Sequence, residues 1–409
     1  MKKFASFVLC LALALTLLAA PAALAEEPVT ITFVSHIYKP WNDMLTQQVE
    51  EFMAANPNVT IEYTTYEHAD LNIKLTTALA ANEAPTIMGI YGPWMPALIE
   101  NGWLDPAPDY VKEDIAQNCF PIAGQSAEFD GETYGYIQHI GINTAVVNPD
   151  FWADNGVEIP TTWEDLAAAS ETLNIVSNGI PMQTAGALNP TKDGSWNVIH
   201  WASILACYGG SLLNEDGTAA AFNSEEGRIS LELYDKLTFA GYKPSDNFIQ
   251  GYNGLCYAGP FDRSSYIENN PDLNFEAREP LSGPAGQITT MYAWFWCVAA
   301  DATDAQKEAA WKFLNYISSD EKYLEMATAI GFLSFRTANY EDETYANDPW
   351  FVAYGKALEN AQLYYAKTSH WEEIDMAIGT ELERLVADEI TVEECLANAE
   401  EAVNKILAK

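Results

Sequence analysis

Aromatic side chains are the residues of this sequence best suited to hold a ligand. The chain contains 12 Trp, 21 Tyr and 17 Phe residues. A flat indole or phenol ring packs against the apolar C–H face of a sugar, while carboxylates and amides hydrogen-bond to its hydroxyl groups. Most aromatic residues of any domain lie in its core. The useful candidates are therefore those in loops after predicted strands, where open α/β sheets collect their ligands.

The candidate positions fall mainly in turns. Residues 36–43 follow the first predicted strand beside a proline, and residues 91–94 follow the third at a Gly-Pro turn. Residue 196 follows a polar loop, and the turn at 259–263 combines a phenyl ring with an acid and a base. We expect ligand contacts from His36, Tyr38, Trp41, Asp43, Glu67, Tyr91, Trp94, His139, Trp196, Phe261, Asp262, Arg263 and Trp294.

Several of these residues also have a structural interpretation. Trp196 either faces a ligand or packs on Trp201. Residues 262 and 263 fit a tight turn with a solvated ion pair, and His139 fits a buried strand position. Alternation places Trp294 and Trp296 on one face of a strand, so at most one or two rings of this segment reach a ligand. The sequence leaves these alternatives open.

No catalytic or metal-binding motif is present. The chain has no G-x-S-x-G, H-E-x-x-H, Walker or G-x-G-x-x-G pattern. Its five histidines include no pair at i, i+3 or i+4, which argues against specific metal capture. A secreted glycosidase would need two carboxylates about 5–9 Å apart, and 58 acids make such a pair easy to imagine but uninformative. We therefore expect a binding protein without catalysis or cofactor.

The first 25 residues predict export. Lys2 and Lys3 precede an apolar run over 4–20, and Ala23 and Ala25 supply the small side chains that a signal peptidase requires. Cys10 lies inside the apolar run and not at the cleavage point, so a lipid anchor is not expected. No other segment approaches the ~18 consecutive apolar residues of a membrane span. The sequence predicts a cleaved signal peptide at 1–25 and a periplasmic or secreted protein.

The net charge limits the classes of ligand and partner, and the cysteine content bears on disulfides. A formal net charge of −38 repels nucleic acid and anionic lipid, and favours a soluble monomer. A neutral or cationic small molecule suits this field better than an anionic ligand. Outside the signal peptide the cysteines are odd in number and none forms C-x-x-C. An oxidising compartment permits one or two disulfides, and their pairing stays open.

The elements that must position the site alternate between strand and helix. Period-two alternation marks strands at 29–34 and 59–63, and a third apolar run covers 85–90. Apolar residues at helical spacing cover 45–53 and 71–79. This βαβ progression predicts a largely parallel sheet in an α/β protein. Farther along, 292–299 reads as a buried strand, the last quarter is helical, and capping boxes begin helices near 161, 303, 318 and 391.

The order of several short phrases resembles the family 1 extracellular solute-binding proteins of ABC importers, the group that contains maltose-binding protein. Residues 162–166 (TWEDL) are similar to the family's "T-W-D-E-L", and residues 131–135 (GETYG) to its "G-K-x-Y-G". Residues 309–314 (AAWKFL) match its "A-W-K-F-L" helix. Two phrases depart from the pattern: Thr86 replaces the aspartate of "A-P-D-V", and Ser334 replaces the proline of "G-x-x-P-x-R".

The resemblance implies a two-lobed periplasmic-binding-protein fold, type II-like, with the ligand cleft between lobes that crossing segments join. It implies one lobe from 26–139 with 298–343, and another from 140–297 with 344–409. The implied function is an extracytoplasmic receptor that delivers a solute, a carbohydrate by the aromatic content, to an importer permease. The same fold binding a polyamine or polyol is the alternative, suited by acids such as Asp43, Glu67 and Asp262.

Overall fold

The computed structural model describes residues 27–189 and 194–409. The predicted signal peptide, with Cys10 and the cleavage point after Ala25, lies outside the described residues. The strands are β1 (Val29–His36), β2 (Val59–Tyr66), β3 (Ile87–Tyr91), β4 (Glu128–Phe129), β5 (Glu132–Thr133), β6 (Gly135–Ile142), β7 (Thr144–Val147), β8 (Ile175–Ser177), β9 (Ile180–Gln183), β10 (Leu255–Ala258), β11 (Glu276–Arg278), β12 (Thr289–Val298) and β13 (Ala361–Leu363).

Helices connect and cover these strands. They are α2 (Lys39–Ala55), α3 (His68–Ala80), η1 (Gly92–Trp94), α4 (Met95–Glu100), α5 (Asp109–Asn118), α6 (Pro121–Ala127), α7 (Pro149–Asn155), α8 (Trp163–Leu173), α9 (Gly194–Cys207), α10 (Glu225–Lys236), α11 (Pro244–Ile249), α12 (Asp262–Asn269), α13 (Asp304–Ile317), α14 (Asp320–Ile330), η2 (Thr337–Glu341), α15 (Glu343–Ala346), α16 (Pro349–Glu359), α17 (Trp371–Val386) and α18 (Val392–Leu407). The two η elements are 3-10 helices.

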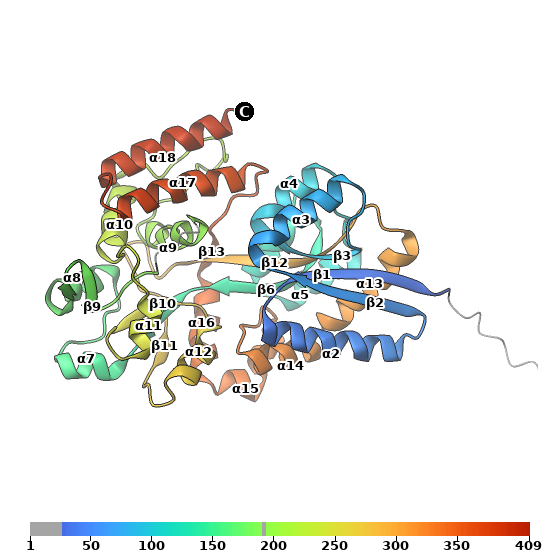
Figure 1. Cartoon of the computed structure of the whole chain (residues 1–409), viewed down its shortest axis with the longest axis horizontal. Coiled ribbons are helices and arrows are strands. Elements are labelled where there is room, and N and C mark those ends of the chain that lie inside the picture. The colour runs from blue at the N-terminus through green and yellow to red at the C-terminus, as the bar shows by residue number, and fades with distance from the viewer. Residues whose placement is uncertain (1–26, 190–193) are drawn as a thin grey trace, which may run out of the picture.

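The molecule has two lobes (Figure 1), and the larger sheet organises the first. Its strand order is β13-β12-β3-β1-β2, with β6 also paired to β12. β1 runs parallel to both β2 and β3, as the βαβ progression predicts, whereas β12 is antiparallel to β3 and β6. Phe33 of β1 packs edge-on against Trp296 and Phe313, which places the lobe's core between the sheet and α13.

The second lobe contains a small antiparallel sheet of order β10-β7-β11 and a group of helices. α9, α10, α17 and α18 pack together at the upper left of Figure 1. The carboxyl-terminal quarter is mainly helical, as the apolar spacing predicts.

β6 and β12 run between the two lobes as an antiparallel pair (Figure 1). Every residue of both strands is buried. A buried ladder of this kind, with one register shift between Trp294 and Phe295, joins the lobes without a flexible tether. The lobe limits at 139/140, 297/298 and 343/344 stay a prediction.

Two of the four predicted helix starts have the expected caps, and the other two are displaced by one residue. Thr303 and Thr391 form capping boxes with Gln306 and Glu394. The predicted cap at Ser318 is wrong by one residue, because Ser318 ends α13 and the Ser319 side chain instead accepts from the Lys322 backbone N–H. The cap expected at residue 161 is likewise formed by the next threonine, at 162.

Two further observations concern the described part of the chain. All five cysteines in it are buried and unbridged: Cys119, Cys207, Cys256, Cys297 and Cys395. Within 27–189 and 194–409, no helix combines the length and apolar character that crossing a bilayer requires.

Candidate ligand-binding cleft

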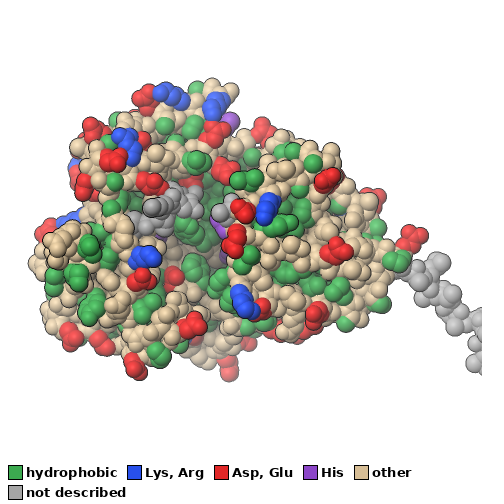
Figure 2. Space-filling model, in the orientation of Figure 1, with side chains coloured by type: hydrophobic (Ala, Val, Ile, Leu, Met, Phe, Trp, Pro, Cys, Tyr) green, Lys and Arg blue, Asp and Glu red, His purple; other side chains and the backbone are tan. Residues whose placement is uncertain are grey.

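A cavity of about 590 Å³ lies between the two lobes, within the usual range for small-molecule sites. Figure 2 shows the surface hollowed in this region. Two parallel strands, β1 and β3, end at it, which is where ligands of open α/β sheets bind. Its lining residues are His36, Ile37, Tyr38, His68, Asn72, Ile73, Tyr91, Pro93, Trp94, His139, Trp196, Phe261, Tyr292, Trp294, Phe332, Glu372, Asp375 and Met376.

A second hollow of about 780 Å³ is lined by α4, the loop at 210–217 and residues 362–369. It is larger, but neither β1 nor β3 ends in it. We therefore place the candidate ligand site in the 590 Å³ cavity.

One wall of the cavity is a cluster of aromatic rings from β3, η1 and β12. The centroid of the Trp294 ring lies 5.2 Å from that of Tyr91 and 5.5 Å from that of Trp94. Residue 92 is glycine where Tyr365 approaches the backbone closely: a Cβ at Gly92 would lie 2.6 Å from the Tyr365 hydroxyl oxygen. Pro93 then occupies the first turn of η1, where its missing N–H is not needed. These constraints hold Trp94 against the cavity.

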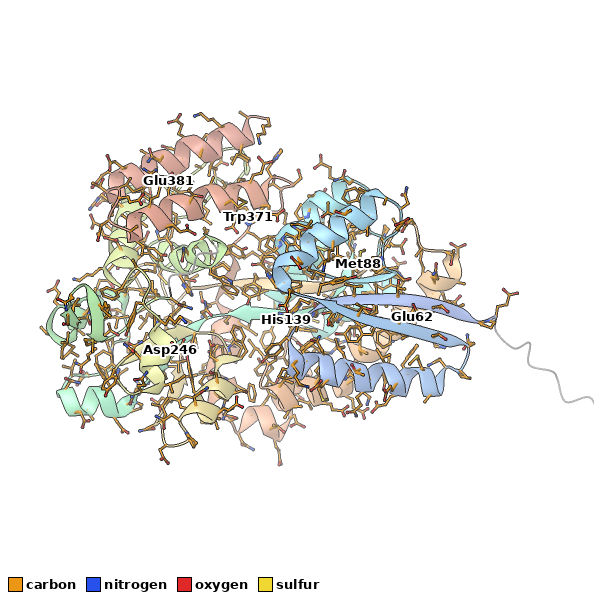
Figure 3. All side chains as sticks on the ribbon, in the orientation of Figure 1. Glu62, Met88, His139, Asp246, Trp371 and Glu381 are labelled. Carbon is orange, nitrogen blue, oxygen red and sulfur yellow. The ribbon has the colours of Figure 1, made fainter. Side chains whose placement is uncertain are left out.

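Imidazole rings lie against this cluster. The His36 ring centroid is 4.5 Å from that of Trp294, and the His139 ring stacks on Trp294 at 6.0 Å. Figure 3 labels His139 in the central region, where β6 passes from one lobe to the other. The Nδ1 atoms of His36 and His139 are buried without a hydrogen-bond partner in the described structure. A neutral imidazole carries one donor and one acceptor, so these rings suit ligand hydroxyl groups.

Burial keeps these imidazoles neutral. It lowers the pKa of His36 to about 4, with a further contribution from the nearby His68. It also lowers the pKa of His139 well below 6.5. Within residues 27–189 and 194–409, no three His, Cys, Asp or Glu side chains are grouped so as to hold a metal ion.

Rings from other elements form the remaining walls. Trp196 and Tyr292 meet edge to face at 5.4 Å. Phe332 stacks on Tyr38 at 5.4 Å and contacts Phe261 at 6.3 Å. The backbone before α2 is fixed by a side chain of the helix, because Asn42 Oδ1 accepts from the Tyr38 N–H at 2.7 Å.

The first two turns of α17 supply the acids of the cavity. Glu372 and Asp375 line it together with Met376, and burial raises the pKa of Glu372. No Lys or Arg appears among the lining residues that the structure describes. The charge of this lining disfavours an anionic ligand.

Eight of the predicted site residues line the cavity: His36, Tyr38, Tyr91, Trp94, His139, Trp196, Phe261 and Trp294. Each comes from a different element or loop, and the fold brings them together.

The other five predicted residues lie outside the lining. Trp41 is only 1% exposed and packs against Phe332 and His139, so it supports the lining from behind. Asp43 is exposed and pairs with Lys39, and Glu67 is exposed just before α3.

Asp262 and Arg263 follow Phe261 but point elsewhere. Asp262 Oδ2 accepts from the Gly259 N–H at 3.0 Å, and burial raises its pKa to about 6. Arg263 forms an ion pair with Asp348 at 2.6 Å and lies over the Trp350 ring. The tight-turn interpretation describes Asp262, whereas Arg263 pairs with a distant residue and not with its neighbour.

Sequence reasoning missed ten lining residues. Some had a usable signal, since Tyr292 alternates with Trp294 on β12 and Phe332 lies in a recognised phrase. Others had none, because nothing local distinguishes the acids of α17 from the many other acids of the chain. The missed residues are Ile37, His68, Asn72, Ile73, Pro93, Tyr292, Phe332, Glu372, Asp375 and Met376.

Comparisons with known proteins agree with this architecture. A binding protein of Brucella abortus is 24% identical over 375 residues, which cover 88% of each chain. The maltotriose-binding protein of Pyrococcus abyssi is 21% identical over 330 residues, 77% of this chain and 68% of that one. The ABC substrate-binding protein Lmo0181 of Listeria monocytogenes, solved in complex with cycloalternan, superposes with a TM-score of 0.80 at 22% identity, covering 93% of this chain and 100% of that chain.

The family model described as "Bacterial extracellular solute-binding protein" matches residues 47–353. That span includes most of both lobes, together with β6 and β12. Members of such a family hold a solute without converting it, which supports the receptor interpretation and not the glycosidase. The chain belongs to the bacterial extracellular solute-binding proteins.

Proposed function

We propose that this protein is the extracytoplasmic receptor of an ABC-type importer, which captures a sugar or oligosaccharide and delivers it to a membrane permease. The observation that carries the proposal is an interlobe cavity with aromatic rings on several walls and buried neutral imidazoles beside them. Such rings take the apolar faces of a sugar, and imidazoles take its hydroxyl groups. The names of the Pyrococcus and Listeria proteins, which refer to maltotriose and cycloalternan, support a carbohydrate ligand.

The described lining suggests a division of roles. Trp94, Trp294 and Trp196 provide the largest flat surfaces, and we assign sugar stacking to them. His36 and His139 provide hydrogen bonds to hydroxyl groups. The remaining predicted residues that line the cavity, Tyr38, Tyr91 and Phe261, complete its walls.

Hinge closure follows from the two-lobed architecture. We propose lobes formed by 26–139 with 298–343 and by 140–297 with 344–409, which rotate about β6 and β12. Rotation about crossing strands leaves the core of each lobe packed. Small-angle scattering should give a smaller radius of gyration with saturating ligand, and an unchanged radius would count against closure.

A thermal-shift screen of the purified protein tests the ligand class. The panel should contain neutral mono- and oligosaccharides, polyols, uronic acids and polyamines, with hits confirmed by calorimetric titration. A ligand at 100 times its Kd stabilises the folded state by about 2.7 kcal/mol, enough for a clear shift. Neutral carbohydrates should shift the melting temperature and uronic acids should not. A response to none of the carbohydrates would refute the proposal.

A polyamine is the second candidate, favoured by one observation. Glu372 and Asp375 lie in the lining without a Lys or Arg among its described residues. Carboxylates beside aromatic rings also suit a protonated amine, through charge and cation–π attraction. A shift with polyamines alone would select this candidate.

We also propose export through a signal peptide at 1–25 and release as a monomer without a lipid anchor. Amino-terminal sequencing of the exported protein should begin at Glu26, and an uncut or lipid-modified product would contradict this. As a receptor, the protein should return a bound oligosaccharide intact after prolonged incubation.

A further inference from the structure

A side-chain hydrogen bond joins the two lobes where α3 and α17 meet at the edge of the cavity. Asn72 Nδ2, on α3 of the first lobe, donates to Glu372 Oε1, on α17 of the second, at 2.7 Å. Both residues line the cavity. The two residues lie near the starts of helices α3 and α17, are 300 residues apart in sequence, and their helices approach each other in Figure 1.

The neighbours of this pair mark an opening. Ile73 and Met376 also line the cavity, yet they are 71% and 66% exposed. Side chains that line a cavity and remain this exposed stand where it meets solvent. The opposite end is formed by β6 and β12, whose residues are all buried, His139 among them. A ligand that fills the cavity therefore has free space toward α3 and α17, and also at Ile37, which lines the cavity and is 45% exposed.

We infer that the Asn72–Glu372 bridge closes this end of the cavity and limits the length of the ligand, so that the receptor encloses a short oligosaccharide and excludes longer chains. The inference rests on the proposed carbohydrate function and adds a size limit to it. A ligand with further sugar units must pass between α3 and α17, where it meets the bridge and the side chains of Ile73 and Met376.

The pair is not needed to hold either helix. α3 and α17 bury their own apolar faces, with Leu71, Leu75 and Leu79 on α3 and Ile374 and Ile378 on α17. A hydrogen bond between half-exposed side chains of two lobes contributes little to folding. The main effect of the Asn72–Glu372 hydrogen bond is therefore to narrow the gap between α3 and α17.

The test compares Asn72→Ala and Glu372→Ala with the wild type. Glu372→Gln is the conservative variant, because its amide oxygen still accepts from Asn72. Glu373→Ala is the matched control: Glu373 lies on the same turn of α17, is exposed, pairs with Lys409 and does not line the cavity. The probes are maltose and each homologue up to maltoheptaose, with Kd measured by calorimetric titration for every protein.

Wild type, Glu372→Gln and Glu373→Ala should bind short members of the series and lose affinity for longer ones. In the two alanine variants the ratio of Kd for the longest to the shortest ligand should fall by about tenfold or more. Equal length preference in all five proteins, or tight binding of maltoheptaose by the wild type, would overturn the inference and leave the carbohydrate proposal standing. If the wild type binds no carbohydrate in the wider screen either, the proposed function fails, and this inference fails with it.

Discussion

Replacing Trp41 and Trp94 by Ala tests which of the two residues stabilises the fold beneath the cavity and which contacts the ligand. Trp41 is 1% exposed and packs against His139, Tyr323 and Phe332. A buried Trp→Ala change costs about 3–5 kcal/mol of folding free energy. In a cooperative unit of 150–250 residues, this lowers the melting temperature by roughly 6–20 °C. Affinity per folded molecule should change little, since the indole does not line the cavity.

Trp94 should behave differently, because one side of its ring lines the cavity. Trp94 is 8% exposed, so a sugar can cover only a small part of the 150–250 Å² of an aromatic side chain. At about 25 cal/mol per Å² this area contributes less than about 1 kcal/mol, and ring stacking adds about 0.5–1.5 kcal/mol, so the loss of binding free energy is about 1–2 kcal/mol. The Kd should therefore rise by roughly 5–30-fold. Some stability is lost too, because the ring is only 8% exposed and contacts Trp294.

Two measurements on each variant decide the matter. Urea unfolding without ligand gives the folding free energy, free of stabilisation by bound ligand. Calorimetric titration with the best ligand of the screen, well below the melting temperature, gives Kd and the active fraction. A Trp41→Ala protein with normal stability and weakened binding would refute the assignment of Trp41 to the core. A Trp94→Ala protein with unchanged Kd would remove Trp94 from the binding surface.

Three further predictions test other parts of the structure. Stability should fall as the pH drops from about 6.5 to 4, because burial lowers the pKa of His36 to about 4 and the unfolded chain takes up the proton first. Urea unfolding at pH 7 and 4.5 measures this, and His36→Gln should reduce the fall. Arg336→Met should cost about 3–5 kcal/mol of stability with unchanged Kd, since the guanidinium is 3% exposed and paired with Asp114 at 2.9 Å. Gly141→Ala should weaken binding about tenfold by titration, because its Cβ would lie 2.0 Å from Cζ of the cavity-lining Tyr292; an unchanged Kd would contradict this.

The fold was largely accessible from the sequence. Period-two alternation located β1 and β2, and helical spacing located α2 and α3, because each element buries one face against the same core. β13 escaped detection, since three residues at 361–363 are too few to show a period.

The site was accessible in part, for a physical reason. Tyr91 and Trp94 follow a buried strand at a Gly-Pro turn, which is a local signal for a residue at a sheet edge. Glu372 and Asp375 have no such signal, because α17 reaches the cavity only after the chain has crossed between the lobes again. Their approach to α3 depends on packing between segments 300 residues apart. No local pattern encodes such a contact.

Trp41 is different, because its position was readable from the chain. The helix begins at Lys39, where Pro40 occupies the first turn, so the segment after β1 is a loop of only two residues. Trp41 then stands four and eight residues before Leu45 and Val49, on the same buried face of α2. Tyr38 precedes the first helical residue, so the helical spacing does not place it on the buried face of α2. Its side chain lines the cavity instead. The apolar spacing of α2 extends one turn before Leu45, to Trp41, which is therefore a core residue. Tyr38 lies before that turn and lines the cavity.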